Sequence, residues 1–229
     1  MRIKAIIFDV DHTLVMSKVD FAEMKRMIVD YLRTEGIPVG DTDAKRLTYE
    51  ITAGAVEHLK KQKREGEISR IMDRVDGIMS EVEMKSVDQA LPIKGAKKTL
   101  QYLRNKGIKI GILTRGCRSY VTQVLTSSRM KECVDEIAAR DDCDNPKPDP
   151  TQMFILMDRM GVGKSETLMV GDHPTDALCA ENAGVQFVGV RTGSWGRQLT
   201  ERLGPMVIDT IANLPEFIAD NFHSSKERK

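Results

Sequence analysis

The stretch Lys4-Ala5-Ile6-Ile7-Phe8-Asp9-Val10-Asp11-His12-Thr13-Leu14 decides the fold. Its apolar part, 5–8, is short and bounded by polar residues, which predicts a strand buried on both faces. Asp9 and Asp11 follow the carboxyl end of that strand, where open parallel α/β sheets bind their ligands. In one pocket, Asp9 could act as a nucleophile or metal ligand and Asp11 as an acid/base partner. The alternative is that the two aspartates merely start a turn.

The composition of the chain narrows the classes of function. A length of 229 residues suggests one or two domains, and 41% hydrophobic with 30% charged residues is typical of a soluble globular protein. The net charge of +1 argues against a nucleic-acid or anionic-membrane partner. Aromatic residues make up only 5%, which also argues against a surface for stacking bases.

The cysteines and the apolar runs bear on location. No two cysteines form a CxxC pair, so neither a disulfide framework nor a zinc site is expected. The N-terminal apolar run is too short for a signal peptide, and no apolar run approaches the ~20 residues of a membrane span. We therefore expect a cytoplasmic protein without a membrane partner, whose thiols are reduced and mostly structural. The cysteines are Cys117, Cys133, Cys143 and Cys179.

Residues 16–91 show helical periodicity and no strand pattern. The spacing predicts a first helix capped by Asp20, a second beginning near Asp41 or Asp43, and a third over 68–82. The methionine-rich stripes favour the core of a small helical bundle over a cofactor site. The basic run 60–64 is interpreted as a solvated helix face rather than a nucleic-acid patch.

After a linker at 91–95, strand patterns alternate with helical ones, which predicts a parallel sheet covered on both faces. The helical insert 16–91 therefore divides an α/β domain made of 1–15 and 92–229. Three prolines should make the loop 141–150 stiff, and the tail 223–229 should be disordered. The further strands are expected at 108–113, 136–139, 167–170, 186–190 and 206–208, with a loop at 191–196 and a last helix at 214–222.

Several chemically capable side chains stand at or near predicted strand ends. Taken alone, Asp172 and Asp176 could simply cap the next helix, and Lys147 could be a solvated loop lysine. Together with Thr114 they would converge at the carboxyl edge of one sheet and form a site.

This combination resembles the haloacid dehalogenase-like hydrolase superfamily, in particular its phosphoglycolate-phosphatase-like members with a helical cap. The likeness spans nearly the whole chain and implies a Rossmann-like core with an inserted all-helical cap. The four family motifs are matched by 9–13, by Thr114, by 147–150 and by 171–176.

The resemblance implies a reaction. Asp9 would attack phosphorus to form an aspartyl-phosphate, and Asp11 would protonate the leaving alkoxide and then deprotonate the attacking water. Lys147 would place a positive charge beside the nucleophile and the phosphate. The hydroxyl of Thr114 and the backbone N–H of Arg115 would bind phosphate oxygens.

The resemblance also implies a Mg²⁺ ion. Its ligands would be the Asp9 carboxylate, the Asp11 backbone carbonyl and Asp172, because Mg²⁺ prefers oxygen donors. Asp176 would orient Lys147 or a metal-bound water, and Thr13 would lie beside these groups without binding the metal.

Three positions depart from the pattern or lack a role in it. Arg115 stands where relatives often have a small polar residue, and it could contact phosphate or point into solvent. His173 is unusual within motif four and is expected at the rim of the site rather than on the metal. Cys117 follows motif two without a partnering base, which favours a structural role.

The expected function is a Mg²⁺-dependent phosphatase acting on a small phosphomonoester, phosphoglycolate-like or a sugar phosphate. The alternatives are a phosphomutase of the same family and a non-catalytic protein that binds phosphorylated metabolites. Dehalogenase and phosphonatase activities are weaker alternatives because those relatives lack a carboxylate at the position of Asp11. The insert should act as a lid with hinges near 14–18 and 89–95, and the protein should be a monomer or homodimer.

Overall fold

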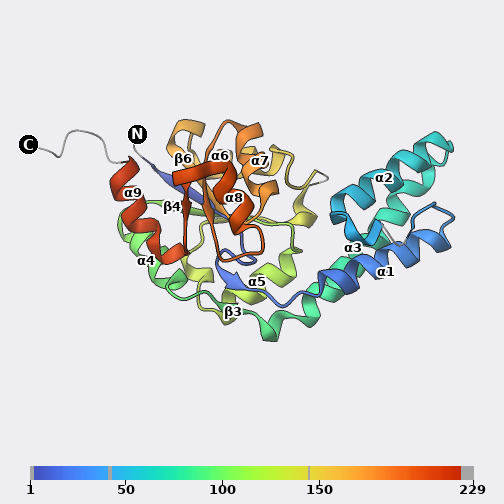
Figure 1. Ribbon diagram of the computed structural model, residues 1–229, viewed down its shortest axis with the longest axis horizontal. Helices are drawn as coiled ribbons and strands as arrows, with labels where there is room; N and C mark the ends of the chain where they lie inside the picture. The colour runs from blue at the N-terminus through green and yellow to red at the C-terminus, as the bar shows by residue number, and fades with distance from the viewer. Residues whose placement is uncertain (1–2, 41–42, 144, 223–229) are drawn as a thin grey trace, which may run out of the picture. The chain divides into compact units, whose positions relative to one another are not determined.

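A computed structural model describes residues 3–40, 43–143 and 145–222 (Figure 1). The chain divides into two compact units, one made of Met1–Ser17 and Asp88–Lys229 and the other of Lys18–Val87. We call them the sheet unit and the helical unit. The insert expected at 16–91 thus differs by a few residues at each end.

Within the described residues, six strands form one sheet in the order β5-β4-β1-β6-β7-β8, and every neighbouring pair is parallel. The central strand β1 is fully buried, because β4 and β6 pair with it on its two edges. The predicted α/β, Rossmann-like fold is confirmed. The strands are β1 (Ala5–Phe8), β4 (Lys109–Leu113), β5 (Glu136–Ala138), β6 (Thr167–Gly171), β7 (Gln186–Val190) and β8 (Val207–Ile208).

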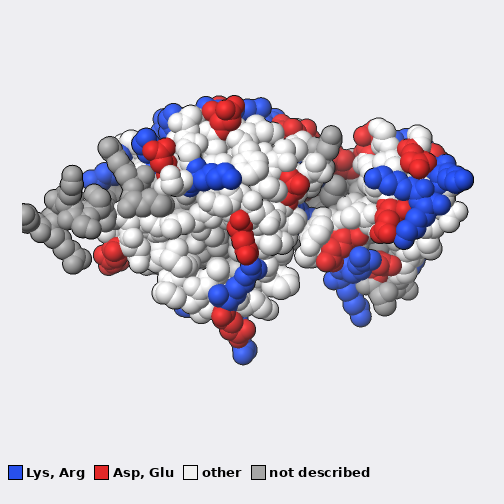
Figure 2. Space-filling model, turned by 90° about the horizontal axis from the view of Figure 1, so that it is seen from above, with Lys and Arg blue, Asp and Glu red and all other residues white. Residues whose placement is uncertain are grey.

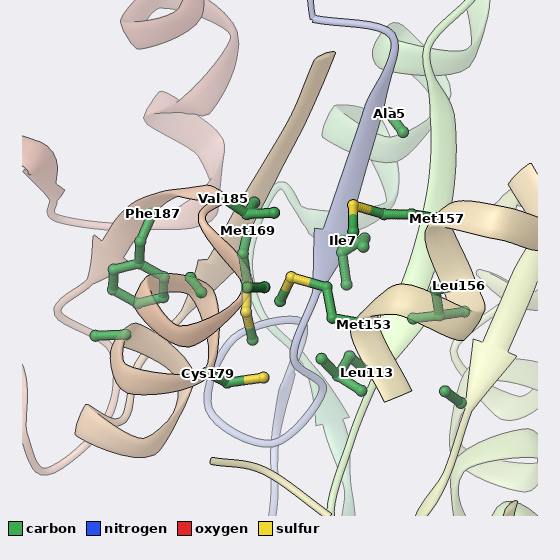
Figure 3. Close-up of a cluster of buried hydrophobic side chains, with 14 of the residues drawn as sticks. Ala5, Ile7, Leu113, Met153, Leu156, Met157, Met169, Cys179, Val185 and Phe187 are labelled. Carbon is green, nitrogen blue, oxygen red and sulfur yellow. The ribbon is translucent and has the colours of Figure 1, made fainter. Parts of the chain in front are cut away.

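Side chains of β1 alternate between the two faces of the sheet. Ala5 and Ile7 point into a cluster that also contains Met153 and Met157 (Figure 3). Gly111 of β4 lets this cluster close, since a Cβ there would lie only 3.0 Å from the Met160 methyl carbon.

The helices of the sheet unit follow the strands in the predicted rhythm, with one difference. The loop expected at 191–196 ends one residue earlier, because a further helix, α8, begins at Gly196. Leu199 of this helix packs in the core cluster. The helices are α4 (Ala96–Asn105), α5 (Arg118–Ser127), α6 (Thr151–Met160), α7 (Pro174–Ala183), α8 (Gly196–Leu203) and α9 (Leu214–Phe222).

A second, two-stranded sheet pairs β2 (Val15–Met16) with β3 (Leu91–Pro92) in antiparallel fashion. The expectation of a simple linker at 91–95 is wrong at its first two residues. Two-residue strands carry no periodicity, so no sequence pattern could reveal them. Both strands belong to the sheet unit, which explains why the division falls beyond Met16.

The helical unit contains α1 (Phe21–Thr34), α2 (Thr48–Lys61) and α3 (Ile68–Lys85). Asp20 caps α1 as predicted, accepting the Glu23 N–H at 2.8 Å. The predicted start of the second helix is wrong. Asp43 begins a short 3₁₀ turn, and α2 starts only at Thr48 because Leu47 is extended. Asp41 lies outside the described residues.

Among the residues that the structure describes, no helix is both long and apolar enough to cross a membrane.

Candidate active site

The site lies at the carboxyl edge of the sheet, where neighbouring strands end. Asp9 follows β1 and Asp172 follows β6, and the Asp9 N–H donates to the Val170 carbonyl at 2.9 Å. Because β1 and β6 pair in register, the residues after them are brought to the same edge. The alternative that Asp9 merely starts a turn is wrong, since its side chain contacts a residue 138 positions away.

Lys147 lies at the centre of the site and is only 1% exposed. Its Nζ donates to Asp9 Oδ1 at 2.6 Å, to Asp176 Oδ1 at 2.7 Å and to the Leu113 carbonyl at 2.8 Å. An ammonium group has three N–H donors, so all three have acceptors here. The alternative of a solvated loop lysine is wrong.

Asp176 joins the first turn of α7 to this lysine. Its second oxygen, Oδ2, accepts the His173 N–H at 3.0 Å, which caps the helix. The carboxylate lies so close to Gly171 that a Cβ at position 171 would overlap it. Asp176 therefore both caps α7, as one alternative held, and contacts Lys147.

Asp172 is 5% exposed and has a weaker set of contacts. Thr13 Oγ1 donates to Asp172 Oδ1 at a long 3.5 Å. The backbone of Gly193, in the loop after β7, approaches so closely that a Cβ there would overlap Asp172 Oδ2. Sequence reasoning missed Gly193, because only the tertiary structure brings this loop onto the carboxylate.

The negative charge of the buried carboxylates exceeds the positive charge of Lys147 beside them. Burial, opposed by Lys147 and reinforced by Asp176, raises the pKa of Asp9 to about 7. Burial together with Asp9 raises the pKa of Asp172 to about 9. Burial alone would lower the pKa of Lys147, but Asp176 and Asp9 raise it above its ordinary value. The site is therefore short of positive charge.

The donor set fits a hard divalent cation. Among the described residues, Asp9, Asp172 and Asp176 each offer a carboxylate oxygen, and these oxygens lie within 4.8 Å of one another. Both oxygens of Asp176 already accept hydrogen bonds, which favours Asp9 and Asp172 as ligands. Oxygen-only donors of this kind suit Mg²⁺.

Thr114 ends β4 and is 1% exposed. Its hydroxyl accepts the Gly116 N–H at 3.0 Å, which tightens the turn after the strand. The Arg115 carbonyl accepts a hydrogen bond from Arg140 Nη1 at 2.8 Å, and the Arg115 side chain is half-buried. The backbone carbonyl of Leu113, the residue before Thr114, accepts a hydrogen bond from Lys147 Nζ. The turn therefore lies next to the charged cluster.

Asp11 is held by a residue that the sequence analysis did not single out. Tyr120 Oη donates to Asp11 Oδ1 at 2.6 Å, and Ser17 Oγ lies 3.2 Å from the same Tyr120 oxygen. Burial raises the pKa of Asp11, against hydrogen bonds from Tyr120 and Ser17. A signal existed, because Tyr120 shares the buried face of α5 with Val124, and a buried tyrosine hydroxyl needs a partner.

His173 is half-buried at the start of α7, where its Nδ1 accepts the Thr175 N–H at 3.1 Å. Its ring meets the edge of Trp195 with centroids 5.1 Å apart. Burial lowers the pKa of His173 to about 4, so the ring is neutral at physiological pH. Cys117 is buried at the residue before α5.

Comparisons with known proteins bear on the family of the chain. The family model of haloacid dehalogenase-like hydrolases matches residues 6–190. A phosphoglycolate phosphatase of Pseudomonas fluorescens (strain Pf0-1) is 26% identical over 221 residues, which cover 92% of this chain and 78% of that protein.

Solved structures share the fold. A hydrolase from Pseudomonas syringae superposes with a TM-score of 0.68 at 22% identity, covering 95% of this chain and 99% of that one. A β-phosphoglucomutase from Clostridium difficile gives a TM-score of 0.65 at 19% identity, with 95% and 96% covered. The family match over 6–190 bears out the resemblance found in the sequence motifs, and the chain belongs to the haloacid dehalogenase-like hydrolases.

Proposed function

We propose that this protein is a Mg²⁺-dependent phosphatase that hydrolyses a small phosphomonoester through an aspartyl-phosphate on Asp9. It is a phosphoric monoester hydrolase. The observation that carries the proposal is the buried contact of Lys147 with both Asp9 and Asp176. Relatives named phosphoglycolate phosphatase support a phosphoglycolate-like substrate, and a sugar phosphate is the alternative.

Lys147 prepares Asp9 for attack. It holds Asp9 Oδ1 at 2.6 Å, which fixes the carboxylate and favours its ionised, nucleophilic form. Asp176 and the Leu113 carbonyl hold the ammonium group in turn, so it cannot turn away from Asp9. A bound Mg²⁺, with Asp9, the Asp11 carbonyl and Asp172 as ligands, would neutralise phosphate charge.

In the first step a carboxylate oxygen of Asp9 bonds to phosphorus, and the ester bond from phosphorus to the leaving oxygen breaks. Asp11 gives its proton to that oxygen, which leaves as an alcohol. In the second step Asp11 takes a proton from water, the water oxygen bonds to phosphorus, and the Asp9–phosphorus bond breaks. Inorganic phosphate leaves and both carboxyl groups return to their starting states.

The turn after β4 would receive the phosphate. Thr114 Oγ and the backbone N–H of Arg115 would stabilise the charge on phosphate oxygens as the bond to the leaving group breaks. Thr13, beside Asp172, would help to orient that carboxylate.

Substitution of the nucleophile tests the proposal. With Mg²⁺ and a panel of phosphorylated metabolites plus p-nitrophenyl phosphate, Asp9→Asn should lower kcat by about 10⁴-fold or more. Asp220→Asn, on the exposed side of α9, is the matched control and should leave the rate unchanged. The proposal fails if the wild type hydrolyses no ester of the panel, or if Asp9→Asn keeps the wild-type rate.

The same assay separates the phosphomutase alternative, since Asp9 and Asp11 suit either reaction. Conversion of one sugar phosphate into another without release of inorganic phosphate would favour the mutase. Binding of metabolites without any turnover would favour the non-catalytic alternative. The lid role of the insert, its hinges near 14–18 and 89–95, the cytoplasmic location and a monomeric or dimeric state stay predictions.

A further inference from the structure

We propose that Tyr120 is a positioning residue for Asp11, whose carboxyl group it orients for proton transfer to the leaving oxygen. The inference rests on the proposed function, because it assigns a role within the same reaction. It concerns a side chain outside the four sequence motifs.

The hydroxyl of Tyr120 is committed to Asp11. Oη donates to Asp11 Oδ1 at 2.6 Å, and a phenol has only one proton to give. Ser17 Oγ lies 3.2 Å from Tyr120 Oη and also hydrogen-bonds to Asp11. The hydroxyls of Tyr120 and Ser17 and the carboxyl group of Asp11 therefore form one buried hydrogen-bonded group, in which each bond polarises the next.

The ring of Tyr120 is fixed as firmly as its hydroxyl. Tyr120 is fully buried, and the backbone of Gly116 packs so closely that a Cβ there would lie 2.9 Å from the Tyr120 ring atom Cδ1. Arg140 holds this turn, because its own N–H donates to the Gly116 carbonyl and its guanidinium to the Arg115 carbonyl. The turn after β4, which would bind the phosphate, therefore also places the tyrosine.

This arrangement restricts the orientation of the Asp11 carboxyl group. Tyr120 donates to Oδ1, and the carboxyl group cannot rotate without breaking that hydrogen bond. A carboxyl group without this contact could rotate, and misplacement by about 1 Å can lower a rate by about 10²-fold. The competing explanation is that Asp11 merely satisfies the hydroxyl of a core tyrosine, with no consequence for proton transfer.

Two esters with different leaving groups distinguish these explanations. An alkoxide needs a proton in order to leave, whereas p-nitrophenolate leaves readily without one. Because kcat/KM reports steps up to the first irreversible one, phosphoryl transfer to Asp9, it isolates the acid role of Asp11. Tyr120→Phe should lower kcat/KM for 2-phosphoglycolate, or for the best alkyl ester of the panel, by about tenfold or more. The value for p-nitrophenyl phosphate should fall much less.

The ratio of the two values is the readout, because it does not depend on the folded fraction of the variant. Ser17→Ala, which leaves the tyrosine in place, should shift the ratio in the same direction by a smaller factor. Tyr102→Phe, an exposed tyrosine of α4, should leave it unchanged.

Equal losses on both esters in Tyr120→Phe, or no loss at all, would overturn the role of Tyr120. A wild-type protein that hydrolyses neither ester would instead refute the proposed function, so the two failures can be told apart.

Discussion

One charged cluster in each unit of the chain shows how differently charged side chains can be used. In the sheet unit, Lys147 is 1% exposed and meets two carboxylates that are themselves buried. In the helical unit, Arg70 pairs with Glu35 at 2.6 Å while its side chain stays 58% exposed. Acidic and basic side chains lie next to one another over the visible surface of the helical unit (Figure 2).

The physical cost of the two arrangements differs. Removing charges from water is expensive, and even a close pair recovers that cost only with good geometry and further hydrogen bonds. An exposed pair keeps its water and contributes little to stability. A buried charge cluster is therefore weak evidence for stability and stronger evidence for chemistry, which is how we interpret the edge of the sheet.

Removing the buried cation should have the largest effect. Lys147→Met keeps the length of the side chain but leaves Asp9 and Asp176 without their shared partner. Breaking a buried pair from one side costs about 3–5 kcal/mol of unfolding free energy. Denaturant unfolding measures that loss, and the phosphatase assay should show that activity is lost as well.

The matched substitution in the helical unit is Arg70→Met. It removes a bidentate pair whose arginine side chain is 58% exposed, so the unfolding free energy should fall by at most about 1 kcal/mol. Equal destabilisation by the two substitutions would contradict the contrast between the units.

Sequence patterns predicted the site well where its residues directly follow strands. Asp9 and Asp172 could be found because each ends an apolar run, and the carboxyl ends of parallel strands meet at one edge. Lys147 follows no strand, and only the resemblance to the family pointed to it.

Other parts of the site depend on contacts that no local pattern encodes. Tyr120 shares a helix face with ordinary core residues, so its hydroxyl contact with Asp11 is visible only in three dimensions. Gly193 looks like any loop glycine until the fold brings it onto Asp172. The start of α2 was misplaced because Asp43, a good cap residue, instead accepts the Gly40 N–H in a short turn.

The stability of the metal-free protein should change with pH over several pH units. The pKa of Asp9 rises from 3.8 to about 7 on folding and that of Asp172 from 3.8 to about 9. At a pH between its unfolded and its folded pKa, each of these two aspartates is ionised in the unfolded chain and still protonated in the folded one. Stability should therefore fall as pH rises from about 4 to about 9. Unfolding midpoints measured across this range in the presence of a chelator check the direction.

Asp172→Asn is the control, because it removes the group with the higher pKa. Between pH about 7 and about 9 Asp9 has lost most of its proton while Asp172 keeps its own, so the variant should lose most of the wild-type slope there. Mg²⁺ should flatten the wild-type curve, since it competes with protons for the same oxygens. Identical slopes for wild type and variant would contradict the assignment.

The smallest effect should come from adding one methyl group beside Asp172. Gly193→Ala places a Cβ where Asp172 Oδ2 now lies, so the carboxylate or the loop must move. The loop cannot retreat freely, because the Thr192 hydroxyl donates to the His12 carbonyl. Mg²⁺ affinity measured by calorimetry should fall by about tenfold, a typical loss when a support of a metal ligand is disturbed. Fluorescence of Trp195, the only tryptophan, gives a second readout.

Gly54→Ala in α2 makes the same chemical change in the helical unit and should have the opposite sign. Nothing lies within 4 Å of the added Cβ, and alanine favours a helix over glycine by about 0.5–1 kcal/mol. One methyl group would thus stabilise a helix in one unit and weaken metal binding in the other. Wild-type Mg²⁺ affinity in Gly193→Ala would mean that the loop does not hold Asp172 in place, and the close approach of its backbone would then be packing without consequence for the metal.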